Sequence, residues 1–313
     1  ERFYNKNMHG VKWDALVDHY KQFLPHIANN YDFQELMSEI LGELNVSHTG
    51  GRYYRPSAKG DDATASLGLL YDMTYTGEGV KVTEVVKGGP CDRKSSRIHA
   101  GSIIKAINGE TVTKDMDISQ LLNNMARKKT LVTLKDGTEE TVLPITSSQF
   151  SSLLYDRWVR RCQHIVDSVS GGRLGYVHLQ SMNDASFRTI YSDMLGKYNL
   201  RDGCVIDTRW NGGGRLHEDV EILTSGKKYL TQMVRGTAMC DMPSRRYNKP
   251  TIMLQCEANY SNAHGTPWVY KHMGIGKLVG APVPGTMTSV NWVTTQDPSL
   301  VFGIPVVGYL QED

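Results

Sequence analysis

The chain has 313 residues, of which 40% are hydrophobic and 22% charged, and its formal net charge is +2 at neutral pH. This length predicts two or three domains, and the composition excludes a disordered or fibrous protein. A net charge so close to zero argues against nucleic acid as a partner. No stretch approaches the ~20 apolar residues that span a bilayer, so no integral membrane segment is expected.

The five cysteines are odd in number and widely scattered, and none of them forms a CxxC pair. This pattern indicates neither a disulfide framework nor a zinc site, and we expect no metal and no cofactor. The chain does not begin with Met. We therefore expect it to be part of a longer protein with additional N-terminal domains.

Residues 1–62 form the first predicted segment, which is helical. Apolar residues recur at helical spacing in VKWDALVDHYKQFL, and a second helix, DFQELMSEILGEL, is expected with Asp32 as its N-cap. This segment contains NVSHTGG, which places Ser47 and His48 where a helix changes into glycine-rich chain. Taken alone, the pair is either half of a catalytic site or a polar turn.

A polar stretch, residues 55–66, is the expected linker to a β-rich domain at 66–145. Short strands dominate that domain, with one helix expected over 117–128. Its segments SLGLLYD and AGSIIKAINGETV resemble those of a PDZ domain. That resemblance implies that backbone amides of one loop bind the carboxylate at a peptide end. The loop residues expected to bind substrate are Leu67, Gly68 and Leu69. The alternative is a small β-barrel spacer.

Residues 151–313 alternate helical and strand-like runs, which predicts an α/β domain with crossover helices. Its apolar strand ending at DTRWNGGG (207–214) leads into three glycines. Successive backbone N–H groups of such a loop bind anions, so it is an oxyanion hole, a phosphate loop or a plain turn. The sequence contains neither of the phosphate-binding motifs, GxxxxGK followed by Ser or Thr and GxGxxG.

A second loop, EANYSNAHGTPW (257–268), joins a predicted strand to a predicted helix. A strand–turn–helix context is where nucleophile elbows occur. We expect the elbow at Ala263, which has no nucleophilic atom, while Ser261 stands two residues earlier. The segment alone is equally consistent with a simple turn.

In this order, the Ser-His pair, the PDZ-like domain, DTRWNGGG and NYSNAHG resemble the catalytic region of tricorn-type serine proteases, relatives of the C-terminal processing peptidases. The resemblance covers nearly the whole chain. It implies a multi-domain α/β fold with a crotonase-like protease core at 151–313. It also implies a serine-type endopeptidase or peptide-processing protease that hydrolyses unfolded polypeptides or oligopeptides through an acyl-enzyme.

The resemblance also implies a role for each matching residue. His48 is the general base, and Ser47 orients it together with a later glutamate. The backbone N–H groups of Gly213 and His264 form the oxyanion hole, and Ala263 stands at the nucleophile position. The neighbouring glycines expected to contact substrate are Gly212 and Gly214. The glutamate is either Glu312 or a residue beyond the chain end.

The alanine at position 263 leaves three interpretations. We favour an engineered replacement of the nucleophile; the others are a naturally inactive, peptide-binding pseudo-protease and a shifted elbow that uses Ser261. A Ser-Lys dyad is a poorer match, because the last lysine is Lys277, only fourteen positions after Ala263. A nucleotide-binding protein is a further alternative that depends on the glycines alone.

The family resemblance also bears on partners and location. We expect a peptide or unfolded protein as substrate and a homo-oligomer as a possible assembly. Relatives that carry a leader are extracytoplasmic, so a periplasmic or secreted protein is expected, with a cytoplasmic one as the alternative.

Overall fold

The computed structural model describes residues 2–58 and 60–311. The chain forms two compact units: unit 1 contains Glu1–Pro56 and Gln163–Asp313, and unit 2 contains Ser57–Cys162. Helices and strands occur in both units, which confirms the predicted mixed α/β fold class. Unit 2 is thus inserted in the sequence between two stretches that fold together.

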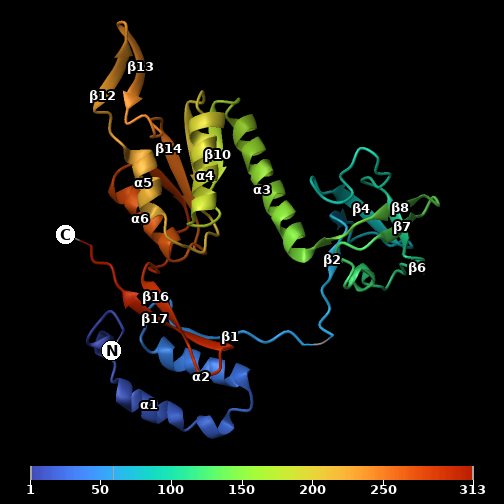
Figure 1. Ribbon diagram of the computed structural model, residues 1–313, viewed down its shortest axis with the longest axis horizontal. Coiled ribbons are helices and arrows are strands. Elements are labelled where there is room, and N and C mark those ends of the chain that lie inside the picture. The colour runs from blue at the N-terminus through green and yellow to red at the C-terminus, as the bar shows by residue number, and fades with distance from the viewer. Residues whose placement is uncertain (1, 59, 312–313) are drawn as a thin grey trace. The chain divides into compact units, whose positions relative to one another are not determined.

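A four-stranded parallel sheet forms the centre of unit 1 (Figure 1). Its strand order is β10 (Leu174–His178), β11 (Gly203–Asp207), β14 (Thr251–Gln255) and β15 (Lys277–Gly280). The associated helices are α4 (Asp184–Ser192), its π-helical continuation η4 (Asp193–Lys197), α5 (His217–Ser225) and α6 (Asn262–His272). Every residue of β11 is buried, as expected for a central strand of a covered parallel sheet.

A three-stranded antiparallel sheet completes unit 1. Its order is β1 (Gly50–Tyr53), β17 (Leu300–Val307) and β16 (Ser289–Thr294). Helices α1 (Trp13–Lys21) and α2 (Asn30–Gly42) precede β1, together with the 3-10 turns η1 (Met8–Gly10) and η2 (Leu24–His26). Helix α2 packs closely against β1. A Cβ added at Gly51 would lie only 2.9 Å from the Gln34 carbonyl oxygen.

The N-terminus of α2 differs from the sequence expectation. Asn29 is the N-cap, since its side chain accepts hydrogen bonds from the backbone N–H groups of Tyr31 and Asp32. Asp32 lies inside the first turn, and its carboxylate accepts from the Ala28 N–H at 2.8 Å. The two side chains therefore form a reciprocal cap, and the prediction of Asp32 as N-cap was wrong by one turn.

A β-hairpin that the sequence analysis did not predict lies between α5 and β14. Its strands are β12 (Leu230–Val234) and β13 (Thr237–Met242), which pair only with each other in the described chain. Figure 1 shows it extending away from the parallel sheet. All five residues of β12 are exposed.

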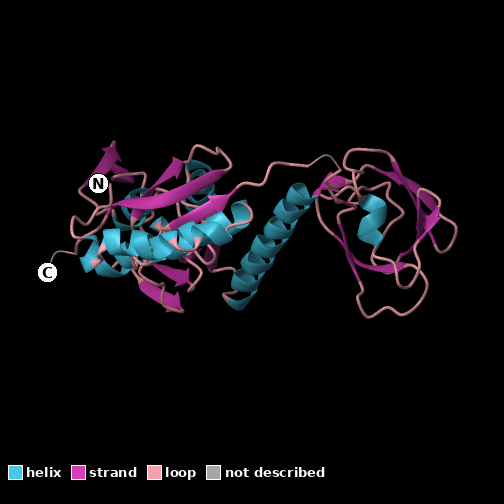
Figure 2. Cartoon of the chain, turned by 90° about the horizontal axis from the view of Figure 1, so that it is seen from below, coloured by secondary structure: helices cyan, strands magenta, loops and turns pink. Residues whose placement is uncertain are grey.

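Unit 2 is built mainly from antiparallel strands around its own apolar core (Figure 2). The main sheet has the order β3 (Leu69–Tyr71), β4 (Val80–Val85), β5 (Ile103–Ile107), β7 (Thr130–Leu134) and β8 (Glu139–Val142), and β6 (Glu110–Thr111) pairs with β5. The remaining elements are the pair β2 (Ala65–Ser66) and β9 (Ile145–Thr146), the 3-10 helix η3 (Ile118–Leu122) and the start of α3 (Ser147–Val169). The helix expected over 117–128 is therefore reduced to η3.

Candidate active site

The glycine loop after β11 is fixed by an ion pair at its start. The Asp207 carboxylate is fully buried and accepts hydrogen bonds from the Tyr176 hydroxyl at 2.7 Å and from Arg209 Nη2 at 2.6 Å. This contact raises the pKa of the Arg209 guanidinium above its usual range. Because the two charged residues are separated by a single position, the pair bends the chain immediately after the strand.

Asn211 holds the rest of this loop. Its side chain donates to the Leu179 carbonyl at 2.7 Å and accepts from the Gly213 N–H at 2.9 Å. The predicted oxyanion donor at Gly213 is thus already engaged within the loop. The N–H group of Gly214 has no acceptor in the described part of the chain, and Gly214 borders the adjacent pocket.

Gly213 itself is required for close approach to the second loop. Its φ of +101° lies in the region that favours glycine, and a Cβ at this position would meet Ser261 Cβ at 2.6 Å. The Tyr260 N–H also donates to the Asn211 carbonyl at 3.0 Å. The two loops predicted from the sequence therefore touch, and Tyr260 and Ser261 form the contact on the side of the second loop.

Ser261 occupies the turn between β14 and α6. It is the N-cap of α6, with φ 57° and ψ −127°, a backbone conformation that is rare for a residue with a side chain. Strain of this kind, at a strand-to-helix turn, is the geometry of a nucleophile elbow. Its own N–H donates to Thr286 Oγ1 at 3.3 Å, and the residue borders a pocket.

The assignment of Ala263 to the nucleophile position stays a prediction, and the structure places the residue as follows. This residue is fully buried inside α6 and belongs to the apolar core that also contains Ile206 and Met253. It is 0% exposed, and it is not among the residues that line the pocket beside Ser261. Helix α6 begins at Asn262, and the strained N-cap conformation falls at Ser261, two residues before Ala263.

The start of α6 also bears on the predicted oxyanion donor at His264. The His264 N–H donates to the Ser261 carbonyl at 2.8 Å in the first turn of α6, so it is not available to an oxyanion. The amide that directly follows the elbow is that of Asn262, for which no acceptor is found among residues 2–58 and 60–311. Unpaired N–H groups are normal in the first turn of a helix, where they form an anion site.

His48 lies beside this elbow, held from both sides. Its N–H donates to the Tyr260 hydroxyl at 2.8 Å, and the two rings lie 4.6 Å apart between centroids. Its Nδ1 is 3.0 Å from Ser47 Oγ and 3.2 Å from Thr288 Oγ1. Half-burial, with the positive charge of Arg52 as a smaller cause, lowers the pKa of the His48 imidazole. A neutral imidazole is the form that accepts a proton.

The segment Thr286–Thr288 was not predicted, yet it contacts both halves of the site. Thr286 binds the N–H of Ser261, and Thr288 lies against Ser47 and His48. Thr288 is separated from His48 by 240 positions, so no local pattern identifies it. No element was predicted from the sequence at these positions.

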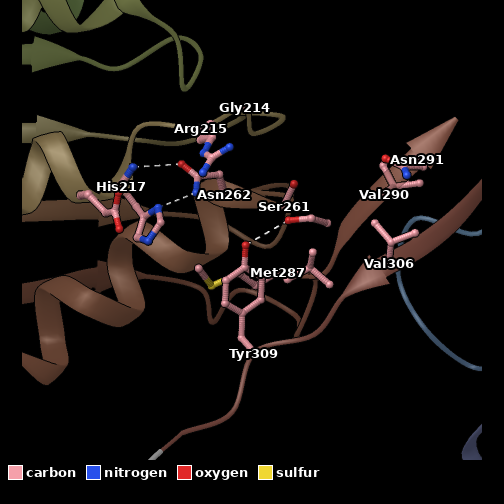
Figure 3. A pocket seen from close by; sticks show the side chains of 13 residues that line it. Gly214, Arg215, His217, Ser261, Asn262, Met287, Val290, Asn291, Val306 and Tyr309 are labelled. Atoms are coloured by element: carbon pink, nitrogen blue, oxygen red, sulfur yellow. Dashed lines mark hydrogen bonds between the residues drawn. The ribbon is translucent and has the colours of Figure 1, made fainter. Parts of the chain in front are cut away.

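A pocket of about 380 Å³ opens next to Ser261 (Figure 3). Met287, Val290 and Val306 line one part, and Arg215, His217 and Glu218 line another. Its volume falls in the lower range of protein ligand sites. A bulky side chain would fit next to the elbow.

The predicted peptide-binding loop belongs to unit 2. The side chains of Leu67 and Leu69 are buried in the core of unit 2. The Gly68 N–H donates to Ser66 Oγ at 3.0 Å. The loop therefore anchors strand β3, and its glycine amide is already engaged.

Further predictions concern metal ligands, a membrane-spanning segment and the glutamate at the chain end. Among the described residues, no three His, Cys, Asp or Glu side chains group as metal ligands do, and no helix is both long and apolar enough to cross a bilayer. Glu312, one of the alternatives for the orienting glutamate, lies outside the described residues.

Two family models match the chain, and one of them covers the loops that build most of this site. Residues 173–313 match peptidase family S41, and residues 1–42 match the tricorn protease C1 domain. These matches, with the relatives below, support a tricorn-type protease of peptidase family S41. The S41 match contains the glycine loop, Ser261 and Thr288, whereas Ser47 and His48 lie between the two matched ranges.

Curated relatives agree with this assignment. Tricorn protease homolog 1 of Streptomyces coelicolor is 26% identical over 93% of this chain, and the tricorn protease of Thermoplasma acidophilum is 22% identical over 88%. The crystal structure of the tricorn protease superposes with a TM-score of 0.84 at 19% identity and covers 99% of this chain. The tricorn-type chain spans only 28%, 26% and 31% of these three proteins.

Proposed function

We propose that this chain is the hydrolytic region of a tricorn-type serine protease in which Ser261 is the nucleophile and His48 the general base. The observation that carries the proposal is the strained N-cap conformation of Ser261, at a strand-to-helix turn that borders a pocket. Ser47, His48 and Ser261 are linked through the Thr286–Thr288 segment. The proposed substrate is a polypeptide chain, since acyl transfer to a serine suits an amide bond.

The proposed reaction proceeds in two halves. Ser261 Oγ attacks the peptide carbonyl carbon while its proton passes to Nε2 of His48, and the N–H groups of Asn262 and Gly214 stabilise the oxyanion. The C–N bond then breaks, and the imidazolium returns the proton to the leaving amine. Water repeats the sequence on the acyl-enzyme, with His48 again as base, and releases the acid product and Ser261.

The pocket gives this proposal a place for the substrate side chain. Because Met287, Val290 and Val306 offer apolar surface near the elbow, a bulky uncharged side chain is a suitable occupant. The charges of Arg215 and Glu218 at the same pocket are opposite in sign. They give no preference for a charged side chain of either sign.

Covalent labelling tests the proposal. A fluorophosphonate probe should modify one residue, Ser261, as located by mass spectrometry of the digested protein. Ser261→Ala should abolish labelling and lower peptide hydrolysis by about 10³-fold or more. The double variant Ser261→Ala/Ala263→Ser should remain inactive, because position 263 is buried. Labelling elsewhere, or recovery in the double variant, would contradict the assignment.

The inactive alternative predicts a different result. A peptide-binding pseudo-protease would bind unfolded peptides with no probe labelling and with no change upon Ser261→Ala. This alternative depended on Ala263 as the nucleophile position, and the proposal that Ser261 is the nucleophile answers that reason. The peptide-end site predicted at Leu67, Gly68 and Leu69 stays a prediction, and titration of the chain with a peptide and its C-terminal amide tests it.

A further inference from the structure

The surroundings of the His48 imidazole contain two hydroxyl groups in direct contact. Ser47 Oγ and Thr288 Oγ1 are 2.6 Å apart, and both lie within 3.2 Å of His48 Nδ1. Thr288 Oγ1 is also 3.1 Å from the backbone carbonyl oxygen of Ser47. Among the described residues, no carboxylate is found in contact with this imidazole nitrogen.

Each hydroxyl carries one hydrogen, and this limits the possible arrangements. If Thr288 donates to the Ser47 carbonyl, the short contact requires Ser47 to donate to Thr288. Both hydroxyl oxygens then have only lone pairs left for His48, so Nδ1 must carry the hydrogen. This arrangement contains three hydrogen bonds: from Thr288 to the Ser47 carbonyl, from Ser47 to Thr288, and from His48 Nδ1–H to the two hydroxyl oxygens.

The reverse arrangement makes one bond fewer. If Thr288 donates to Ser47 Oγ, then Ser47 donates to Nδ1 and the hydrogen of the imidazole lies on Nε2. The Ser47 carbonyl then loses its donor, and the described chain supplies no other. Because an unpaired, partly buried carbonyl is unfavourable, the first arrangement is preferred.

We propose that Thr288 is a positioning residue that fixes the tautomer of His48, using the Ser47 carbonyl as the anchor of a two-hydroxyl relay. The relay places the hydrogen on Nδ1 and leaves Nε2 unprotonated, which is the form that accepts a proton. It contributes to the orienting task that an acidic residue performs in a Ser-His-Asp triad. Its catalytic consequence rests on the function proposed above, whereas the tautomer itself does not.

Nitrogen NMR of the chain labelled with ¹⁵N-histidine tests the tautomer directly. His48 is assigned by the signals that disappear in His48→Gln. Above its pKa, the wild-type imidazole should give the Nδ1–H pattern. An Nε2–H pattern would overturn the proposal, whatever the activity. An Nδ1–H pattern without any peptide hydrolysis would retain the relay and contradict the proposed function.

Variants at position 288 test the role of the hydroxyl. Thr288→Val keeps the shape and removes the hydrogen bonds, so we expect kcat to fall about 10- to 100-fold with KM within twofold, and a mixture of tautomers. Thr288→Ser should restore both kcat and the Nδ1–H signal. Thr294→Val is the matched control on β16, since no hydrogen bond of the exposed Thr294 hydroxyl is found in the described chain. A wild-type kcat and spectrum in Thr288→Val would overturn the proposal.

Discussion

The Asn262 side-chain amide lies 2.7 Å from Nδ1 of His217, and its oxygen accepts the backbone N–H groups of Leu216 and His217 (Figure 3). One buried side chain thus joins the residue after the elbow to the start of α5. Asn262, whose backbone amide directly follows Ser261, is therefore held by α5 as well as by its own helix α6.

The first prediction concerns this connection. Asn262→Ala removes three hydrogen bonds from a residue that is 7% exposed, and it leaves two backbone donors without acceptors. We expect a loss of about 2–4 kcal/mol in the free energy of unfolding, measured by urea denaturation. Asn262→Asp retains the acceptor oxygen, so its loss should be smaller. Equal losses in both variants would contradict the role of the oxygen.

The second prediction concerns the buried ion pair that begins the glycine loop. Asp207→Ala leaves the Arg209 guanidinium and the Tyr176 hydroxyl without their shared acceptor, and a loss of about 3 kcal/mol is expected. Asp202→Ala breaks the exposed pair with Arg173 and should cost less than about 1 kcal/mol. Thermal denaturation of the two variants compares them, and a similar change in both would refute the argument.

The third prediction separates two adjacent glycines. Gly213→Ala forces a Cβ against Ser261 and requires a φ near +101°, so it should displace the elbow and lower kcat about 100-fold. Gly212→Ala meets no atom within 4 Å, and its unfolding temperature should stay close to that of the unmodified chain. Unimpaired hydrolysis by Gly213→Ala would show that the contact is not required.

The fourth prediction concerns pH. Burial and the charge of Arg52 both disfavour the His48 imidazolium, so its pKa lies below the ordinary value of 6.5. The value of kcat/KM should fall as pH decreases through that lowered pKa and stay level above it. Arg52→Met removes the positive charge, raises the pKa and moves the acid limb to higher pH. Arg173→Met, at an exposed ion pair with Asp202, is the control for which the limb should not move.

Local patterns predicted the two loops and the histidine. The all-apolar strand before Asp207, the glycines after it and the strand–turn–helix around Ser261 are sequence features that the fold retains. Parallel pairing of β11 with β14 places these loops at one edge of the sheet, where sites of α/β proteins form.

Local patterns could not predict the residue at which helix α6 begins or the contacts between distant segments. The position of the elbow depends on where α6 begins, and that start is held by the bonds from Asn262 to Leu216 and His217, 46 and 45 positions away. Thr288 contacts His48 only through folding of the whole of unit 1. Neither relationship leaves a pattern in neighbouring residues.

The shortened helix at 117–128 has a similar cause. Asn124 and Arg127 adopt positive φ values of 58° and 63°, which a helix does not allow. Their N–H groups instead donate to the carbonyls of Ala63 and Pro144, each in a distant segment. These tertiary bonds override a sequence with good helix-forming residues.

Strand β1 follows His48 in the sequence, and its pairing determines when the site can assemble during synthesis. Within the described chain, β1 pairs only with β17, with Gly50 opposite Gly303. A nascent polypeptide that has already produced the elbow still has no docked partner for the strand next to the base. Ribosome-bound chains should therefore stay unreactive toward an active-site probe until residues 300–307 have emerged, a delay built into the connectivity of the fold.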